Sequence, residues 1–340
     1  MNNKLYHSIE FLRGLLATTV AVCHLYLSKE NNIHLEAISS LCVEVFFIIS
    51  GFVLAPQLIK LFETRKIENF KIFIFRRFLR TLPVYIFYLI IISLLLNKFL
   101  SIDFFKYLFF IQNFFSINVE LDYFSIAWSL SVEEWFYVIF IIFLLFLKRS
   151  FLVKNIKICL LIWFFIFFLL KIFYFSFNDF DFGTSLRRIT IFRLDTIALG
   201  SIFFIYKDLI LENIKKYNII VFFLPIPLYF IFISGFRISD IISIQILLLF
   251  THLFSIAVLY NFILFDDFFK HIYKISIFFG KISYSIYLSH LILIILFDKL
   301  FQDISIFILG IYLILLFFIS LLSRKYIEEI FLNLRPKFNF

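Results

Sequence analysis

The stretch from residue 8 to residue 28 carries an arginine and a histidine inside an otherwise apolar run. Histidine exchanges a proton near neutral pH, so it can serve as a general base or as a nucleophile toward a hydroxyl acceptor. Arg13 and His24 are eleven residues apart. In a helix this spacing is about three turns, or about 16 Å of rise, and puts both on one face. Because ionisable residues inside a span usually face a polar cavity or a partner, the spacing predicts a polar track into the membrane.

Two histidines lie well inside predicted spans, and both are candidates for chemistry. His24 is the stronger one, because Arg13 shares its face. His290 ends a second polar face, on which Ser283, Tyr287 and His290 follow i, i+4, i+7 spacing. We expect this second face to line a substrate site. The alternative for each histidine is a structural, hydrogen-bonded side chain.

Three arginines precede Pro83 in the segment RRFLRTLP. Arg76, Arg77 and Arg80 have i,i+3 and i,i+4 spacings, so a helix would gather them into one cluster. Guanidinium forks match the geometry of phosphate. The cluster therefore predicts a site for a phosphorylated cytoplasmic donor, just inside the membrane and ahead of the third span. The alternative is anchoring to lipid head groups or control of topology.

Carboxylates stand near the ends of two other predicted spans. Glu133 and Glu134 lie in WSLSVEEWFYVIF, and adjacent residues of a helix point about 100° apart. We expect one to line a pocket and the other to meet the interface or an arginine; simple contact with head groups is the alternative. In RLDTIALG, Arg193 and Asp195 are expected to form a local ion pair, with Asp195 a candidate for binding substrate.

Two more ionisable residues fall inside apolar runs. Glu44, in the second predicted span, needs a partner, for which Arg13 or a basic loop residue can serve. His252, in the eighth, has little polar company in the sequence. The three cysteines show neither metal-ligand spacing nor a disulfide framework, so we predict no metal site.

The composition places these residues in a membrane protein. The chain has 340 residues, is 63% hydrophobic and has a mean hydropathy of +1.02, which excludes an ordinary soluble globular protein. Its apolar runs repeatedly reach the length of about 20 residues that a spanning helix needs. We predict an all-α bundle of about ten transmembrane helices, with an interfacial or re-entrant helix at 102–118. The predicted spans are 8–28, 37–62, 82–100, 126–147, 156–176, 191–206, 218–235, 240–264, 282–297 and 304–323.

The charge pattern predicts the orientation of this bundle. The net charge is +9, and most basic residues lie in the loops 63–81, 148–155, 207–217 and 265–281 and in the tail. The positive-inside asymmetry puts both termini in the cytoplasm and explains the charge without nucleic-acid binding. The first run is expected to be a retained span rather than a signal peptide. We expect one membrane domain over residues 1–340, with spans within 8–323 and a short cytoplasmic tail at 324–340.

Taken together, six motifs resemble the acyltransferase family 3 membrane proteins, over residues 8 to 323. They are Arg13 with ten residues before His24, VFFIISGF, RRFLRTLP, WSLSVEEWFY, RLDTIALG and GKISYSIYLSH, in the family's order. The resemblance implies a bundle of about ten spans that moves an acyl group, usually acetyl from acetyl-CoA, onto a hydroxyl. The acceptor it implies is a sugar of a bacterial surface polysaccharide, lipopolysaccharide or peptidoglycan, or a small glycosylated molecule.

Individual residues match the family by position. His24 resembles its essential histidine and Arg13 the paired arginine; Arg77 and Arg80 match its Arg-x-x-Arg pair. Glu133 and Glu134 likewise match its paired glutamates. Glu44 stands where the family more usually has aspartate. Some relatives add an extracytoplasmic hydrolase-like domain, so this chain is expected to complete transfer alone or with a separate extracytoplasmic partner.

Two functions follow, from different classes. The first is an O-acetyltransferase of the bacterial inner membrane, with acetyl-CoA held by Arg76, Arg77 and Arg80 and a lipid-linked or polymeric glycan as acceptor. His24 acts as base or carries the acetyl group, and Glu133 or Glu134 orients His24 or binds the acceptor. The second is a transporter or flippase for a glycolipid or an anion, which intramembrane charges suit equally well. Consumption of acetyl-CoA distinguishes the two.

Overall fold

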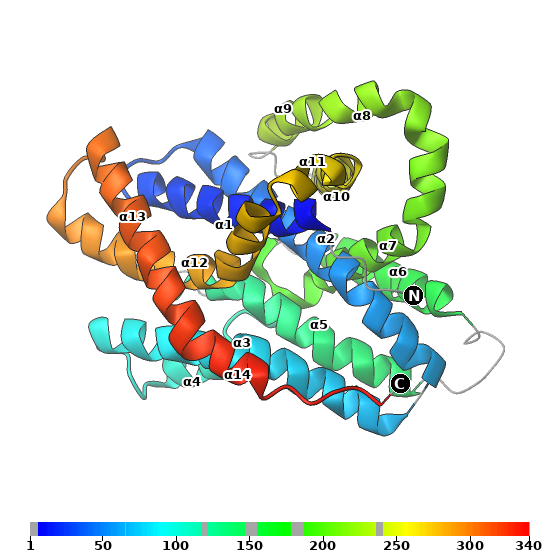
Figure 1. Cartoon of the computed structure of the whole chain (residues 1–340), viewed down its shortest axis with the longest axis horizontal. Coiled ribbons are helices and arrows are strands. Elements are labelled where there is room, and N and C mark those ends of the chain that lie inside the picture. The colour runs from blue at the N-terminus through cyan, green and yellow to red at the C-terminus, as the bar shows by residue number, and fades with distance from the viewer. Residues whose placement is uncertain are drawn as a thin grey trace. The chain divides into compact units, whose positions relative to one another are not determined.

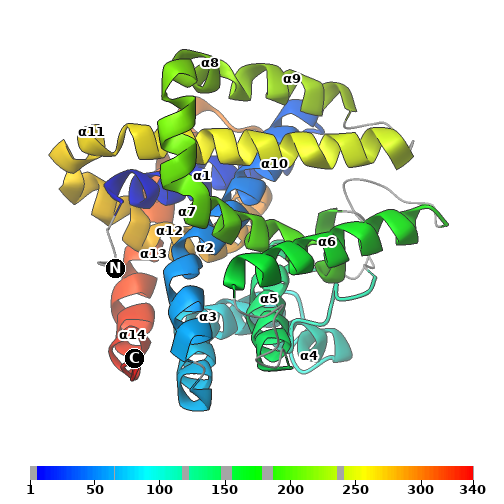
Figure 2. The same ribbon diagram turned by 90° about the vertical axis from the view of Figure 1, so that its right-hand side faces the viewer.

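The structure, a computed structural model, describes residues 6–64, 66–116, 122–146, 155–177, 187–235 and 241–339, and every regular element in these ranges is helical (Figures 1 and 2). The helices are α1 (His7–Leu27), α2 (Ile33–Thr64), α3 (Ile67–Leu95), α4 (Ile102–Leu108), α5 (Ala127–Phe146), α6 (Ile156–Phe175), α7 (Leu194–Ile214), α8 (Asn218–Phe223), α9 (Pro225–Gly235), α10 (Ile241–Leu264), α11 (Asp266–His271), α12 (Tyr273–Leu300), α13 (Ile306–Ser323) and α14 (Glu329–Asn333). A 3-10 turn (Thr190–Phe192) precedes α7, and a π-helical turn (Arg324–Glu328) joins α13 to α14.

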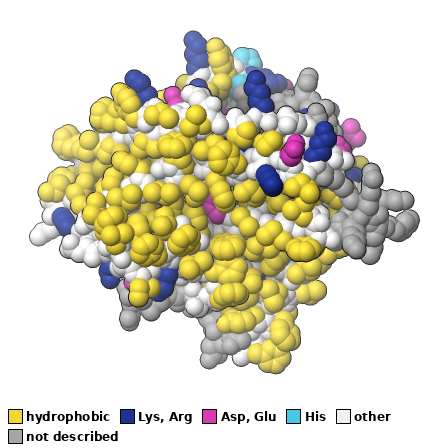
Figure 3. Space-filling view, turned by 90° about the horizontal axis from the view of Figure 1, so that it is seen from below, with side chains coloured by type: hydrophobic (Ala, Val, Ile, Leu, Met, Phe, Trp, Pro, Cys, Tyr) yellow, Lys and Arg dark blue, Asp and Glu magenta, His cyan; other side chains and the backbone are white. Residues whose placement is uncertain are grey.

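Eight of the described helices are long and apolar enough to cross a membrane, and a bent pair, Thr190–Phe223 with Pro225–Ser234 at 51°, would make nine. Hydrophobic side chains cover most of the face seen in Figure 3, a surface that suits lipid better than water. The predicted all-helical membrane protein is confirmed. The count of ten spans and the cytoplasmic termini stay predictions, and the predicted inside loop 148–155 lies almost wholly outside the described residues.

The predicted start of the third span differs from the start of the helix by about four helical turns. α3 begins at Ile67 rather than at residue 82, and Pro83 lies inside it. Phe70 and Phe73 are buried, so the segment ahead of the proline has its own apolar stripe at helical spacing and packs as helix. The arginine cluster therefore stands on a helix and not in a loop. The predicted helix at 102–118 is also shorter, since α4 ends at Leu108.

The contacts divide the chain into two compact units, which we describe separately. Unit 1 comprises Met1–Phe46, Arg76–Phe104 and Tyr260–Pro336; unit 2 comprises Phe47–Phe75, Phe105–Leu259 and Lys337–Phe340. The boundaries fall within α2, α3, α4 and α10, so each of these helices contributes to both units. Whether the chain acts as one domain stays a prediction.

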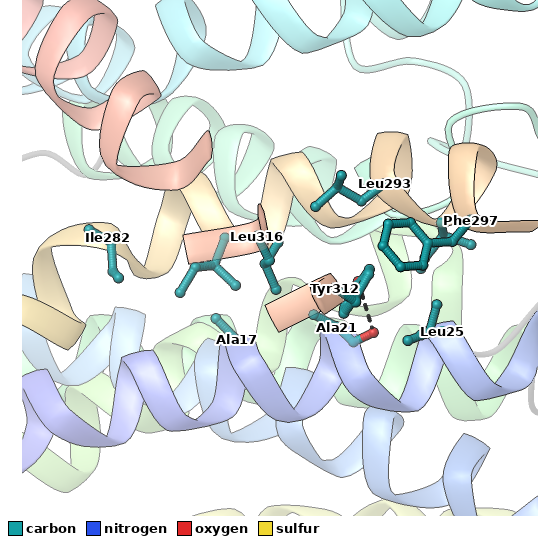
Figure 4. Close-up of a cluster of buried hydrophobic side chains, with 10 residues drawn as sticks. Ala17, Ala21, Leu25, Ile282, Leu293, Phe297, Tyr312 and Leu316 are labelled. Atoms are coloured by element: carbon teal, nitrogen blue, oxygen red, sulfur yellow. Dashed lines mark hydrogen bonds between the residues drawn. The ribbon is translucent and has the colours of Figure 1, made fainter. Parts of the chain in front are cut away.

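In unit 1, an apolar core joins α1, α12 and α13 (Figure 4). Ala17, Ala21 and Leu25 lie at i, i+4, i+8 along α1 and are fully buried, as expected of one helical stripe. The hydroxyl of Tyr312 donates to the Ala21 carbonyl at 3.2 Å, which satisfies a polar group inside this core.

Two glycines let α1 and α12 approach closely. A Cβ atom on Gly14 would lie 2.8 Å from the carbonyl oxygen of Phe279, and one on Gly280 would overlap the side chain of Glu10. Farther along, Lys29 Nζ pairs with Asp298 Oδ1 at 2.6 Å. The contacting residues advance together along both chains, so the two helices run parallel.

In unit 2, a second pair of glycines brings α2 against α7. A Cβ on Gly51 would overlap the carbonyl of Ile197, and one on Gly200 the carbonyl of Ile48. Ser201 Oγ donates to the Gly51 carbonyl at 2.8 Å. This crossing fixes the start of α7, where the RLDTIALG motif lies.

Candidate functional site

The parallel packing of α1 and α12 brings His24 and His290 into contact. His24 Nδ1 lies 3.1 Å from His290 Nε2, and the ring centroids are 5.3 Å apart. His290 has no exposed surface, whereas His24 is half-buried. The two histidines that the sequence selected independently therefore form one hydrogen-bonded pair in unit 1.

The direction of this hydrogen bond depends on which nitrogen of each neutral ring carries the proton. His290 Nδ1 is buried and makes no hydrogen bond within the described part of the chain. With the proton of His290 on Nδ1, its Nε2 is an acceptor and His24 Nδ1 donates to it. The lone pair of a neutral His24 then lies on Nε2.

The other residues of the predicted face on α12 are buried with His290. Tyr287 is packed edge-on against Phe46, with ring centroids 6.3 Å apart, and its ring lies 5.7 Å from that of His290. Ser283 Oγ donates to the Gly280 carbonyl at 2.9 Å. The backbone of its own helix thus satisfies this hydroxyl, while a role for Ser283 and Tyr287 toward substrate stays a prediction.

Arg13 stands at the other end of the α1 track, among carboxylates. Its Nη1 lies 3.4 Å from Glu10 Oε2, and it interacts electrostatically with Glu328 in the π-helical turn after α13. Glu44 is buried, as predicted; its pairing with Arg13 stays a prediction.

The three arginines of α3 gather as predicted, and a fourth joins them. Burial and the positive charges of Arg80, Arg77 and Arg76 lower the pKa of Arg335 to about 9, whereas Glu328 acts in the opposite direction. Arg77 is buried. Unit 1 therefore contains both the histidine pair and a concentrated patch of guanidinium groups.

The paired glutamates belong to unit 2. Glu133 accepts hydrogen bonds from Ser50 Oγ at 2.6 Å and from the Tyr137 hydroxyl at 3.0 Å. Glu134 is buried. Next to it, Trp135 Nε1 donates to the carbonyl of Phe110 at 2.9 Å, which holds the start of α5. Their predicted roles, orienting His24 or binding the acceptor, remain untested.

Asp195 forms a salt bridge that the sequence did not predict. Its Oδ2 lies 2.7 Å from Lys171 Nζ in α6, and both side chains are buried; the expected local ion pair with Arg193 stays a prediction. Arg193 is fully buried, with its guanidinium over the ring of Phe47 at 6.0 Å. Its charge also acts on Asp195.

His252 has polar partners in the structure that its neighbours in the sequence do not supply. His252 Nε2 lies 3.3 Å from Thr196 Oγ1, and the side chain also interacts with the charges of Asp195 and Lys171. These polar partners lie far from it in the sequence, on α6 and α7, so the neighbours of His252 along α10 gave no sign of them.

Three charged residues of these clusters were missed, although each leaves some trace in the sequence. Lys171 is a lone cation deep in an apolar run, a position that requires a partner. Glu328 follows Arg324 by four residues, the spacing of a helical ion pair, and the two atoms Arg324 Nη1 and Glu328 Oε1 lie 2.5 Å apart. Arg335 was counted only as part of a basic tail.

Comparison with known proteins assigns the chain to a family. The sequence model of the family described as "Acyltransferase domain" matches residues 6–324. The peptidoglycan O-acetyltransferase OatA of Listeria monocytogenes is 29% identical over 177 residues, which cover 47% of this chain and 27% of the relative. No solved structure matches the chain.

Staphylococcal proteins give similar alignments. A putative O-acetyltransferase of Staphylococcus aureus (strain COL) is 31% identical over 136 residues, 36% of this chain and 22% of the relative. The O-acetyltransferase OatA of another S. aureus strain is 31% identical over 130 residues, 34% of this chain and 21% of the relative. Each alignment thus spans about a quarter of the relative's length.

Proposed function

Because this chain belongs to the acyltransferase family whose sequence model matches residues 6–324, we propose that it is a membrane O-acetyltransferase. It transfers acetyl from cytoplasmic acetyl-CoA to a sugar hydroxyl of a bacterial surface glycan, at the inner membrane. The names of the relatives, which include a peptidoglycan O-acetyltransferase, support this choice of reaction. Peptidoglycan is accordingly the first acceptor to test, and surface polysaccharide or lipopolysaccharide the next.

The observation that carries the proposal is the 3.1 Å contact between His24 Nδ1 and His290 Nε2. A histidine whose Nδ1 proton is held by a fixed acceptor presents its Nε2 lone pair in a defined direction, the arrangement in which imidazole serves as a general base. Here a neutral histidine takes the place that a carboxylate fills in the well-known triads. No net charge is then buried in the pair when it is at rest.

In the proposed reaction, His24 Nε2 removes the proton of the acceptor hydroxyl while its oxygen attacks the thioester carbonyl carbon. The carbon–sulfur bond breaks, the acetyl ester forms, and the thiolate of coenzyme A takes the proton from His24. A covalent route, with acetyl carried on Nε2 before the acceptor arrives, needs the same lone pair. Both routes require His24 and both are helped by His290.

The donor side of the proposal uses the arginines of α3. Arg76, Arg77 and Arg80 hold the phosphates of acetyl-CoA through charge-assisted hydrogen bonds. Arg13 precedes His24 by about 16 Å along the axis of α1. It extends the positive charge toward the acetyl end of the donor. Electrostatic contact of both Arg13 and Arg80 with Glu328 supports this continuity within unit 1.

The test is release of coenzyme A thiol and acetylation of peptidoglycan fragments by the purified full chain in lipid nanodiscs. We expect His24→Ala to lower the rate by about 10²- to 10⁴-fold, the contribution of a general base. His24→Asn places an amide donor near the position of Nδ1 but has no Nε2 lone pair, so it should be equally inactive. His271→Ala, at an exposed position of α11, is the matched control and should keep full activity.

Two results would overturn the proposal. Normal acetylation by a folded His24→Ala protein would remove the histidine from the mechanism. Movement of a glycolipid or anion across the bilayer with no consumption of acetyl-CoA would identify a transporter instead.

A further inference from the structure

The chain after α14 lies against α3, the helix that carries Arg76, Arg77 and Arg80. Arg76 Nη1 donates to the carbonyl of Pro336 at 2.5 Å, and the red C-terminal segment lies beside α3 in Figure 1. In unit 2 the next residues are fixed as well, because Asn339 N donates to Asn69 Oδ1 at 3.0 Å and Asn69 Nδ2 to the Asn339 carbonyl at 3.3 Å. The segment is therefore docked along α3, and it delivers Arg335 to the cluster.

Arg335 arrives with donors that no described residue uses. Its Nε and Nη2 atoms are buried, and neither makes a hydrogen bond within the described part of the chain. A buried donor without an acceptor destabilises the folded state, and more so when the group is charged. These unpaired donors lie among other guanidinium groups, where a bound anion would both accept their hydrogen bonds and offset the positive charge. The arrangement therefore indicates an anion-binding site.

The charge balance around Arg335 points the same way. The contacts of this cluster link six guanidinium groups to three carboxylates, an excess of three positive charges. Glu328 offsets Arg335 only in part, because its carboxylate is paired with Arg324 at 2.5 Å. The groups are Arg13, Arg76, Arg77, Arg80, Arg324 and Arg335 with Glu10, Glu328 and Glu329.

We propose that Arg335, carried by the segment Leu334–Pro336, is the fourth arginine of the phosphate-binding site formed by Arg76, Arg77 and Arg80. The ligand is a polyanion with phosphate esters, and the nucleotide end of coenzyme A is the one to which we commit. This inference rests on the proposed function, since it adds a binding residue to the donor side of that reaction. Arg335 acts on binding alone, because the acetyl group is handled elsewhere in unit 1.

The test measures coenzyme A binding and thermal unfolding of the full chain in detergent. We expect Arg335→Gln to weaken coenzyme A binding roughly tenfold or more, as loss of a bidentate charged contact should. Arg335→Lys keeps the charge but not the forked guanidinium, so its affinity for coenzyme A should lie between those of wild type and Arg335→Gln. Lys337→Gln, at the exposed position that directly follows this segment, is the matched control and should bind as wild type does.

A structural role for Arg335 predicts different results. If Arg335 were structural, Arg335→Gln would lower the melting temperature of the ligand-free protein. On our proposal the same substitution removes a surplus half-buried cation, and should leave that temperature unchanged or raise it. In turnover, Arg335→Gln should raise KM for acetyl-CoA and leave kcat unchanged.

Each remaining outcome has a separate meaning. Equal binding by wild type and Arg335→Gln would overturn this inference and leave the proposed function standing. No coenzyme A binding by wild type would overturn both. If Arg335→Gln lost stabilisation by a short-chain phosphatidic acid and not by coenzyme A, the site would belong to a lipid head group, and our assignment to the donor would be wrong.

Discussion

Gly14 of α1 lies directly against the backbone of Phe279 in α12, with no space between them for a methyl group. This contact lies on the same helix pair as the histidines, ten or eleven residues before them in each chain segment. The distance between His24 and His290 is therefore set by how closely two backbones approach at a remote glycine.

Replacing Gly14 by alanine should damage both stability and transfer. The added Cβ would lie 2.8 Å from the Phe279 carbonyl oxygen, and the shift needed to relieve it should cost about 1–3 kcal/mol of unfolding free energy. A displacement of about 1 Å between the histidines should slow transfer by about 10²-fold. Gly310→Ala, where nothing lies within 4 Å of the added atom, should stabilise α13 slightly. Thermal unfolding measures the stability of both variants, and release of coenzyme A thiol measures their transfer rates. Equal losses in Gly14→Ala and Gly310→Ala would contradict this account.

His290 should be required as a hydrogen-bond acceptor rather than as a base. His290→Leu removes the acceptor for His24 Nδ1, and we expect kcat to fall by about 10²-fold while KM for acetyl-CoA is unchanged. His290→Gln offers an amide oxygen in a similar place and should recover part of that loss. If the leucine and glutamine variants were equally inactive, acceptance of this hydrogen bond would not explain the role of His290.

The buried salt bridge between Lys171 and Asp195 gives a stability prediction in unit 2. Lys171→Met leaves the Asp195 carboxylate buried without its partner, and should cost about 3–5 kcal/mol. The double variant Lys171→Met/Asp195→Leu should recover most of that loss, because replacing both charges is close to neutral. Lys207→Met, which breaks an exposed pair with Asp208, should cost less than about 1 kcal/mol.

The same double variant tests whether Asp195 binds substrate. Its side chain has no exposed surface and is engaged by Lys171 and by Thr196 Oγ1 at 3.4 Å. We therefore expect the double variant, once shown to be folded, to keep wild-type KM for the acceptor. A rise in that KM with normal stability would instead support the sequence-based prediction that Asp195 binds substrate.

Asp122, outside the membrane-spanning helices, should make stability depend on pH. Burial raises the pKa of its carboxyl, although Tyr107 and Arg188 act in the opposite direction. Such a group contributes stability that is fully present below its unfolded pKa of about 3.9 and is lost as the pH rises through the folded pKa. The unfolding free energy of wild type should thus fall relative to that of Asp122→Asn as the pH rises above about 3.9, the unfolded pKa. If the unfolding free energy of wild type instead rose with pH relative to that of Asp122→Asn, the ion pair with Arg188 would outweigh the effect of burial on Asp122.

The sequence predicted what depends on local spacing. Apolar runs set the positions of most helices to within a few residues, and i, i+3, i+4 spacing gathered the arginines of α3. Local cues misplaced the start of α3, because Pro83 and three arginines suggested a loop, whereas the buried stripe of Phe70 and Phe73 continues the helix.

Contacts between distant segments were beyond such reasoning. His24 and His290 were each selected, but nothing in a single sequence shows that they touch across 266 residues. Lys171 with Asp195, and Arg335 with the α3 cluster, escaped for the same reason. Their side chains become partners only through close helix packing, and the glycines that allow it look unremarkable in the printed sequence.

The pairing of α1 with α12 also bears on how the protein is made. His290 follows His24 by 266 residues, so the segment with His24 is translated well before its partner exists. His24 acquires that partner only when α12 packs against α1. On the proposed function, a chain whose synthesis has not reached α12 lacks the histidine pair and should not consume acetyl-CoA.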